Sequence, residues 1–170
     1  MGVLIRKSTA DDREKIYSIV NEAAVAYREV IPGDRWHEPY MSREELDREI
    51  SLGVEFWVAE DDGTMAGVMG IQDKGKVALV RHAYVTTGTQ RKGIGTALLH
   101  HVQSLTVKPI LIGTWSDAVW AIDFYRRNGF AVVTPAEKEK LLRTYWSIPQ
   151  RQIETSVVLA DRHWRQANPV

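Results

Sequence analysis

The residues best suited to ligand chemistry form a basic turn at positions 90–96, with the sequence Gln-Arg-Lys-Gly-Ile-Gly-Thr. The turn follows a strand-like segment, residues 77–85, and leads into an apolar helix. The first backbone N–H groups of a helix have no partner within the helix, and the helix dipole adds partial positive charge there. Gly93 and Gly95 carry no side chain that would keep a phosphate away. The turn therefore predicts a site for a phosphate group.

The glycine spacing excludes two common nucleotide-binding motifs. Gly88 and Gly93 match the first half of a P-loop, but Ile94 and Gly95 stand where that motif needs lysine and then serine or threonine. The chain contains no G-x-G-x-x-G pattern, which excludes the Rossmann fingerprint. The motif that remains is Gln-x-x-Gly-x-Gly.

This motif resembles the acetyl-CoA pyrophosphate loop of the GCN5-related N-acetyltransferase (GNAT) superfamily, Q/R-x-x-G-x-G/A, with Gln90, Gly93 and Gly95 at its defined positions. A second segment, residues 121–130, reads Ala-Ile-Asp-Phe-Tyr-Arg-Arg-Asn-Gly-Phe. It is similar to the family signature A-x-x-F-Y-x-x-x-G-F. Two independent matches at the family's spacing are stronger evidence than one short glycine pattern. The resemblance covers about residues 3–159.

The resemblance implies an α/β (α+β) fold, the GNAT acyl-CoA N-acyltransferase fold, with a mixed, mostly antiparallel sheet of six to seven strands and helices on both faces. In that family the fourth and fifth strands splay apart, and the pantetheine arm of acetyl-CoA lies between them along the fourth strand. Acetyl-CoA is thus the implied cosubstrate, and no metal is expected. The implied cofactor-binding residues are Ala83, Val85, Thr87, Gln90, Arg91, Lys92, Gly93, Ile94, Gly95 and Thr96.

The implied reaction is direct attack of an amine on the acetyl carbonyl, which needs a proton acceptor for the amine and a donor for the departing thiolate. Tyr125 matches the family tyrosine that often directs its hydroxyl at the CoA sulfur. A phenol of ordinary pKa, about 10, is protonated at neutral pH and can donate a proton there. The alternative is that Tyr125 only packs against the fifth strand.

The sequence leaves the general base open. In histone-type members of the family a glutamate lies eleven positions before the loop glutamine, and Leu79 stands there in this chain. His82 lies on the same predicted strand and is our candidate catalytic base, although a strand histidine is often only structural. Glu55 and Glu60 flank the second predicted strand, where solvent-exposed strand ends are the simpler interpretation. A chain of water molecules could replace a dedicated base.

The loop between the first two predicted helices is the candidate acceptor site, because the corresponding family region lines that side. Its candidate substrate-binding residues are Trp36, His37, Glu38 and Tyr40. Aromatic faces and one acid can hold a cationic amine. Equally, the aromatic residues can fix the loop to the core, and the segment 145–149 either overhangs the site or packs beneath it.

Hydrophobic periodicity and turn residues predict the elements that position these groups. The expected strands are residues 3–6, 56–60, 64–72, 77–85, 109–115, 130–133 and 155–159. The expected helices begin after Ser8 or Thr9, at Ser42, after the glycine turn, before Tyr125 and at Thr134. The crossover through the helix after the glycine turn implies that strands 77–85 and 109–115 are parallel neighbours. Ser116 and Asp117 are expected to cap the helix that carries Tyr125.

Length and composition favour one domain, residues 1–160, followed by a tail at 161–170. The chain has 22 basic and 22 acidic residues, so no overall charge draws it to nucleic acid or to a membrane. It contains no cysteine, which excludes disulfides and thiolate metal sites. No signal peptide or membrane span is recognisable, and a cytoplasmic location is expected.

These observations predict an acetyl-CoA-dependent N-acetyltransferase that acts on a small-molecule or peptide amine. The family resemblance is also compatible with a homodimer. Two alternatives remain open. The enzyme could prefer a longer acyl-CoA, or the chain could be a non-catalytic acetyl-CoA-binding sensor or interaction module, which the leucine at position 79 permits.

Overall fold

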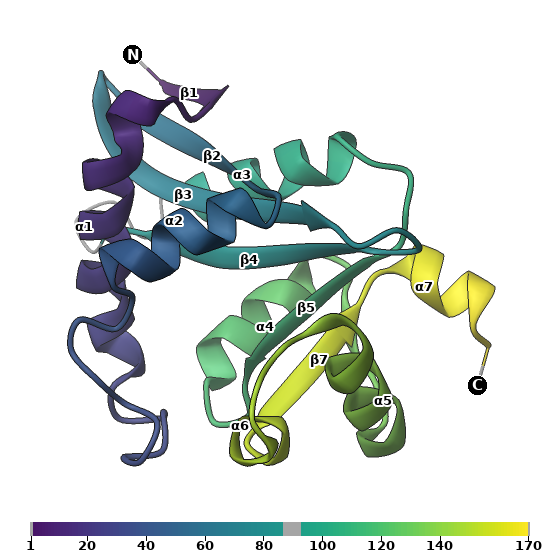
Figure 1. Cartoon of the computed structure of the whole chain (residues 1–170). Coiled ribbons are helices and arrows are strands. Elements are labelled where there is room, and N and C mark those ends of the chain that lie inside the picture. Colours follow the sequence, from purple (N-terminus) through teal and green to yellow (C-terminus); the bar gives the residue numbers. More distant parts are fainter. Residues whose placement is uncertain (1, 87–92, 170) are drawn as a thin grey trace.

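The computed structural model describes residues 2–86 and 93–169, and a seven-stranded mixed sheet runs through the molecule (Figure 1). The strands are β1 (Val3–Lys7), β2 (Val54–Asp61), β3 (Thr64–Asp73), β4 (Ala78–Val85), β5 (Ile110–Trp115), β6 (Ala131–Val132) and β7 (Ser156–Ala160). Their order is β1-β2-β3-β4-β5-β7-β6. Of the neighbouring pairs, β4 and β5 are parallel and the others antiparallel, which confirms the predicted mixed sheet and its crossover.

Helices cover both faces of the sheet. They are α1 (Arg13–Ala24), α2 (Arg43–Ser51), α3 (Ile94–Ser104), α4 (Val119–Arg127), α5 (Pro135–Tyr145), α6 (Gln150–Glu154) and α7 (Arg162–Ala167), with short 3-10 turns η1 (Ala10–Asp12) and η2 (Val25–Tyr27) at the two ends of α1. In Figure 1, α1, α2, α5 and α6 lie in front of the sheet, and α3 and α4 lie behind it. As predicted, Ser42 and Thr134 begin α2 and α5, where each side chain accepts a hydrogen bond from a backbone N–H three residues later.

The apolar side of α1 faces the sheet. Its buried members are Ile16, Ile19, Val20, Ala23 and Ala24. They pack with β2 and β3, while apolar residues of α3 and α4 pack on the other face against β3, β4 and β5. Within the part of the chain that the structure describes, none of these helices combines the length and the apolar composition needed to cross a bilayer.

β4 and β5 separate soon after they begin. They pair over residues 78–80 and 110–112. Beyond that point β4 continues to Val85 and β5 to Trp115 without pairing to each other, and Figure 1 shows β5 turning away from β4. β5 remains paired to β7 as far as Trp115. The sheet therefore opens into a wedge between its two halves.

A β-bulge distorts β4 at this opening. Val68 pairs with Tyr84 and Gly70 with Arg81, so β4 carries one residue more than β3 between these pairs. His82 lies in the bulge with φ +54°, a left-handed conformation that is uncommon outside glycine. A Cβ on Gly70 would lie 2.9 Å from the Arg81 carbonyl oxygen. The bulge therefore depends on a glycine opposite it.

The predicted cap of α4 is wrong. Ala118 is the N-cap residue, and no side chain caps this helix. The Ser116 hydroxyl instead donates a hydrogen bond to the Thr155 carbonyl oxygen, at 3.0 Å. Ser116 thus joins the end of β5 to the start of β7, a contact between residues 39 positions apart.

The segment expected as a tail contains α7. Asp161 caps this helix by accepting a hydrogen bond from the Trp164 backbone N–H, at 3.0 Å. The Trp164 side chain packs against the apolar cluster that also holds Leu142 of α5 and Leu111 of β5. These contacts attach α7 to the core.

The close approach at the bulge predicts a stability difference between two glycines. Gly70→Ala should lower the free energy of unfolding by about 1–3 kcal/mol, because the added methyl group would overlap backbone and side-chain atoms. Gly33→Ala is the matched control, since no atom lies within 4 Å of its added Cβ. Urea unfolding would measure both, and equal stability of the two variants would contradict the packing described here.

Candidate active site

Two cavities adjoin where β4 and β5 separate. The larger, about 470 Å³, lies among the start of α3, α4 and the end of α1, and we call it the α3 cavity. The smaller, about 140 Å³, lies between β4 and β5, and we call it the wedge cavity. Four residues line both cavities: Tyr27, Ala83, Tyr84 and Tyr125. Ligands in the two cavities would therefore meet at these residues.

The start of α3 forms one wall of the α3 cavity. Gly93 is its N-cap residue with φ +76°, a left-handed conformation that glycine adopts without strain. The next three residues, Ile94, Gly95 and Thr96, also line the cavity, as do Ala83 and Val85 of β4. Their place at a helix N-terminus provides backbone donors and partial positive charge for an anion.

Two further residues define what this wall can hold. A Cβ on Gly95 would lie 3.4 Å from the Phe124 ring, so a longer side chain there would enter the cavity. Arg127, at the end of α4, also lines the cavity and adds a full positive charge that the sequence analysis did not select. The described residues therefore fit a phosphate-containing ligand. Thr87, Gln90, Arg91 and Lys92 lie outside the described residues.

Tyr125 lies between the two cavities. Its side chain on α4 is 7% exposed and contacts the rings of Phe124 and Phe130, at centroid distances of 5.2 and 6.1 Å. Burial raises the pKa of the Tyr125 phenol far above its usual value of 10. Burial likewise raises the pKa of Tyr27 to about 12. Both hydroxyl groups are therefore protonated at neutral pH and can act as hydrogen-bond donors.

His82 lines the wedge cavity and is held by an acid on α2. Its Nε2 donates a hydrogen bond to Oε2 of Glu49 at 2.8 Å, because an ionised carboxylate can only accept. The ring also stacks on Phe56, with centroids 6.0 Å apart. In the neutral imidazole, a hydrogen on Nε2 leaves Nδ1 as a proton acceptor. The contact with Glu49 thus selects the tautomer that a general base requires.

Arg81 completes this cluster. Its guanidinium lies 3.1 Å from Oε1 of Glu49 and donates to Oε1 of Gln72 at 3.2 Å. Gln72 in turn donates to the Leu52 carbonyl oxygen at 3.0 Å. Burial raises the pKa of Glu49, but the hydrogen bond from His82 and the charge of Arg81 lower it more, so the pKa lies below its ordinary value. Glu49 is therefore ionised at neutral pH.

The other acids considered from the sequence lie away from both cavities. Glu55 pairs with Lys7 at 3.7 Å, and Glu60 pairs with Arg6 at 2.9 Å, both between β2 and β1. Leu79 is fully buried in the cluster under α5. Within the described residues, Glu49 is thus the acid in direct contact with a wall of the wedge cavity.

The loop after η2 contributes one of its four predicted residues to the wedge cavity. Tyr40 lines that cavity, whereas Trp36, His37 and Glu38 are outside its lining. Trp36 stacks on Tyr40, with centroids 5.7 Å apart, and its Nε1 donates to Glu38 at 3.4 Å. His37 also stacks on Tyr40, with ring centroids 6.2 Å apart. These three residues are therefore placed to support Tyr40.

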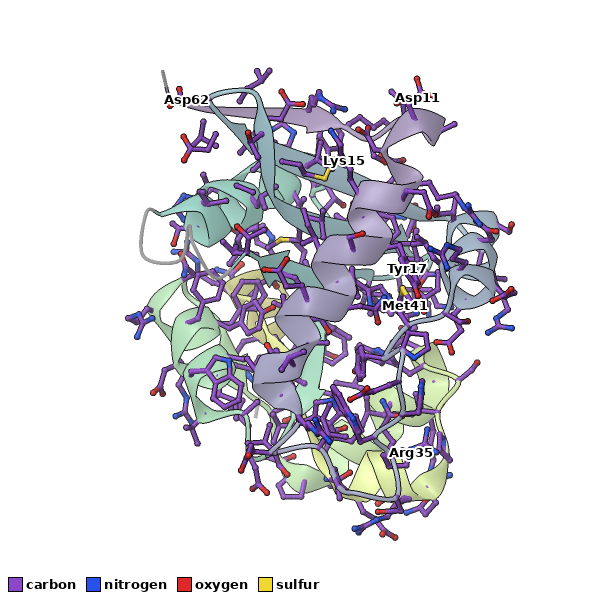
Figure 2. All side chains as sticks on the ribbon, turned by 90° about the vertical axis from the view of Figure 1, so that its left-hand side faces the viewer. Asp11, Lys15, Tyr17, Arg35, Met41 and Asp62 are labelled. Carbon is purple, nitrogen blue, oxygen red and sulfur yellow. The ribbon has the colours of Figure 1, made fainter. Side chains whose placement is uncertain are left out.

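Asn21 of α1 fixes the end of this loop. Its Oδ1 accepts from the Met41 backbone N–H, and its Nδ2 donates to the Met41 carbonyl, both at 2.9 Å. Nδ2 also donates to the Tyr17 carbonyl at 2.9 Å, and Figure 2 shows Tyr17 and Met41 together beside α1. The main chain next to Tyr40 is therefore bound to a rigid helix.

Sequence analysis did not select Asn21 or Glu49. For Glu49, the helical spacing from Leu46 is a signal that could have identified it. Glu49 lies three residues after the fully buried Leu46 and so shares the sheet-facing side of α2, where an acid needs a partner. Trp146 belongs to the segment 145–149, for which the sequence left two positions open, and it lines the wedge cavity together with Gln152 of α6. That short helix has no distinctive sequence signal.

Solved structures with the same arrangement define the fold class. The chain is similar to PaiA N-acetyltransferase from Thermoplasma acidophilum in complex with coenzyme A, with a TM-score of 0.71, 19% identity, and coverage of 95% of this chain and 99% of that chain. The chain is also similar to a GNAT-family acetyltransferase from Staphylococcus aureus Mu50, with a TM-score of 0.70 and 16% identity; the match covers 95% of this chain and 99% of that chain. The ribosomal-protein-S18-alanine N-acetyltransferase from Escherichia coli is similar with a TM-score of 0.66 and 18% identity; the match covers 94% of this chain and 93% of that chain. The fold is that of GNAT acetyltransferases.

The sequence itself identifies the family. The model of the acetyltransferase (GNAT) domain matches residues 15–144, and the chain belongs to this family of acyltransferases. No curated protein sequence is significantly similar to the chain.

The ionised Glu49 predicts a pH-dependent contribution to stability. Glu49→Gln should lower the free energy of unfolding by about 1–2 kcal/mol at pH 7, because His82 and Arg81 lose a charged acceptor. Because the folded-state pKa of Glu49 is lowered, this stabilisation is present above the unfolded pKa of about 4.3 and is lost as pH falls through the folded pKa. Denaturant unfolding between pH 3 and pH 7 would measure it.

The matched control is Glu44→Gln, on the same helix but exposed to solvent. A difference between wild type and Glu49→Gln that is small at pH 7, or that grows as the pH falls, would contradict the proposed charge on Glu49.

Proposed function

We propose that this protein is an N-acetyltransferase that transfers an acetyl group from acetyl-CoA to a primary amine of a small molecule or peptide. The observation that carries the proposal is the pair of adjoining cavities at the β4–β5 wedge, one of them built on a helix N-terminus. The complex of the structurally similar Thermoplasma acidophilum enzyme with coenzyme A supports the choice of cosubstrate.

Acetyl-CoA is assigned to the α3 cavity. Its pyrophosphate would be bound by the backbone N–H groups at the start of α3, with Arg127 as a further cation. The pantetheine arm would lie along Ala83 and Val85 of β4, and Thr87, outside the described residues, belongs to the same assignment through the sequence. Gln90, Arg91 and Lys92 belong to the same assignment through the sequence motif.

The reaction requires the protein to accept one proton, from the amine, and to donate another, to the departing sulfur. Acetyl-CoA supplies the acetyl group as a thioester, and the amine nitrogen must be neutral when its lone pair forms the new C–N bond. His82 would accept the amine proton at Nδ1, with Glu49 holding the opposite ring nitrogen. Tyr125 would donate a proton to the sulfur as the C–S bond breaks. The products are an amide and free CoA.

The alternative is an acetyl-CoA-binding sensor without catalysis. A screen of amines that reports free CoA separates the two functions, because only the enzyme releases CoA in proportion to the acceptor. Binding of acetyl-CoA without release by any amine would support the sensor. Comparing acetyl-CoA with longer acyl-CoA thioesters in the same assay determines the acyl preference.

The cosubstrate assignment predicts a loss of binding at the start of α3. Gly95→Glu would place a long, negatively charged side chain in the α3 cavity and should weaken acetyl-CoA binding by at least 100-fold. Gln103→Glu is the control, because it adds the same charge near the other end of α3, outside this cavity. Calorimetric titration would measure both, and retained affinity in Gly95→Glu would refute the assignment.

The role of Tyr125 predicts a loss of turnover rather than of affinity. Tyr125→Phe keeps the ring packing but removes the proton donor, so kcat should fall by about 100-fold while acetyl-CoA affinity is unchanged. Tyr145→Phe on α5 is the control, because that residue lines neither cavity. Steady-state kinetics with an accepted amine would test the role, and an unchanged kcat in Tyr125→Phe would remove the residue from the mechanism.

A further inference from the structure

The walls of the wedge cavity restrict the acceptor, and from them we infer its chemical class: a compact monoamine whose body is uncharged and about the size of one six-membered ring. This inference rests on the proposed N-acetyltransferase function and names the substrate of the same site. It disfavours polyamines and free amino acids as acceptors.

Six tyrosine and tryptophan side chains are among the described residues that line the cavity. They come from six separate parts of the chain, namely η2, the loop before α2, β4, β5, α4 and the segment after α5. The aromatic lining residues are Tyr27, Tyr40, Tyr84, Trp115, Tyr125 and Trp146. Such faces bind an apolar ring by stacking and attract an ammonium group through their negative faces.

The charged groups in the wall are already engaged. Among the described lining residues, those that can carry charge near neutral pH are Arg81 and His82. Both contact Glu49, and Arg81 also contacts Gln72. A substrate carboxylate would therefore find no free cation, and a second ammonium group would find no acid in this part of the wall. Leaving either charge without a partner in such a cavity is unfavourable.

The remaining polar lining groups are neutral. Thr114 and Gln152 line the cavity, together with Ser156, which is 5% exposed. Hydroxyl and amide groups can orient an amine by hydrogen bonds without neutralising a charge. Enclosure by this wall also lowers the pKa of a bound ammonium group, because burial disfavours the charged form. The cavity thereby favours the neutral amine that the reaction needs.

The volume of the cavity fits a compact acceptor. Its 140 Å³ is close to the roughly 150 Å³ of an engineered apolar cavity that binds benzene. Trp146 closes one side by lying against Gly113, where an added Cβ would be only 3.3 Å from the indole. With this side closed by the indole, the cavity volume fits one ring and a short amine-bearing arm.

The first experiment compares acceptors in the wild-type enzyme with acetyl-CoA. The panel is phenethylamine, phenylalanine, which adds only a carboxylate, and 1,4-diaminobutane, which replaces the ring with a second amine. The expected kcat/KM for phenethylamine exceeds that for each of the others by at least 10-fold. Equal or faster turnover of phenylalanine or the diamine would overturn the inference while leaving the acetyltransferase function intact. Release of CoA by no amine would overturn both.

The second experiment adds a carboxylate to the wall without changing its shape. Gln152→Glu should raise the ratio of kcat/KM for 1,4-diaminobutane over phenethylamine by at least 10-fold, because the second ammonium then has a partner. A ratio within one variant is unaffected by the fraction of protein that folds. Gln166→Glu, on α7 outside the cavity, is the control. An unchanged ratio in Gln152→Glu would overturn the inference.

Discussion

The early separation of β4 and β5 is the constraint on which the rest of the site depends. The two strands pair over three residues each. Beyond these residues they form no hydrogen bonds to each other, although β4 continues to Val85 and β5 to Trp115. Main-chain polar groups in such a position need partners, and a ligand between the strands can supply them. The bulge at His82 lies at the same point and turns β4 away from regular pairing with β3. Both cavities open around this interruption.

The two faces of the sheet present different chemical groups. The face with α3 and α4 presents a helix N-terminus and Arg127, which suit an anionic ligand. The opposite face presents Tyr40, held from α1, and a cluster of Arg81, Glu49 and His82 whose charges compensate one another. The tyrosines between the cavities have raised pKa values because they are buried, so they separate the two faces with neutral, protonated groups.

Local signals in the sequence predicted the fold well, whereas contacts between distant residues escaped prediction. The caps at Ser42 and Thr134 depend on residues three positions apart and were predicted correctly. The expected cap at Ser116 failed because Thr155, 39 residues later, competes for its hydroxyl. The contact of His82 with Glu49 joins residues 33 positions apart. His82 also lies in a bulge that no sequence pattern predicts. For the same reason the sequence could suggest a base but not its partner.

The hydrogen bonds between Asn21 and the Met41 backbone affect which loop positions next to the cavity are restricted in sequence. Asn21 grips the peptide groups of residue 41 rather than any loop side chain, so anchoring is independent of the sequence that precedes it. This anchor leaves the side chains of residues 32–39 unrestricted, whereas Ile31 is held in the core at 4% exposure. The position of the loop is thus set by its backbone, separately from the chemistry of its side chains.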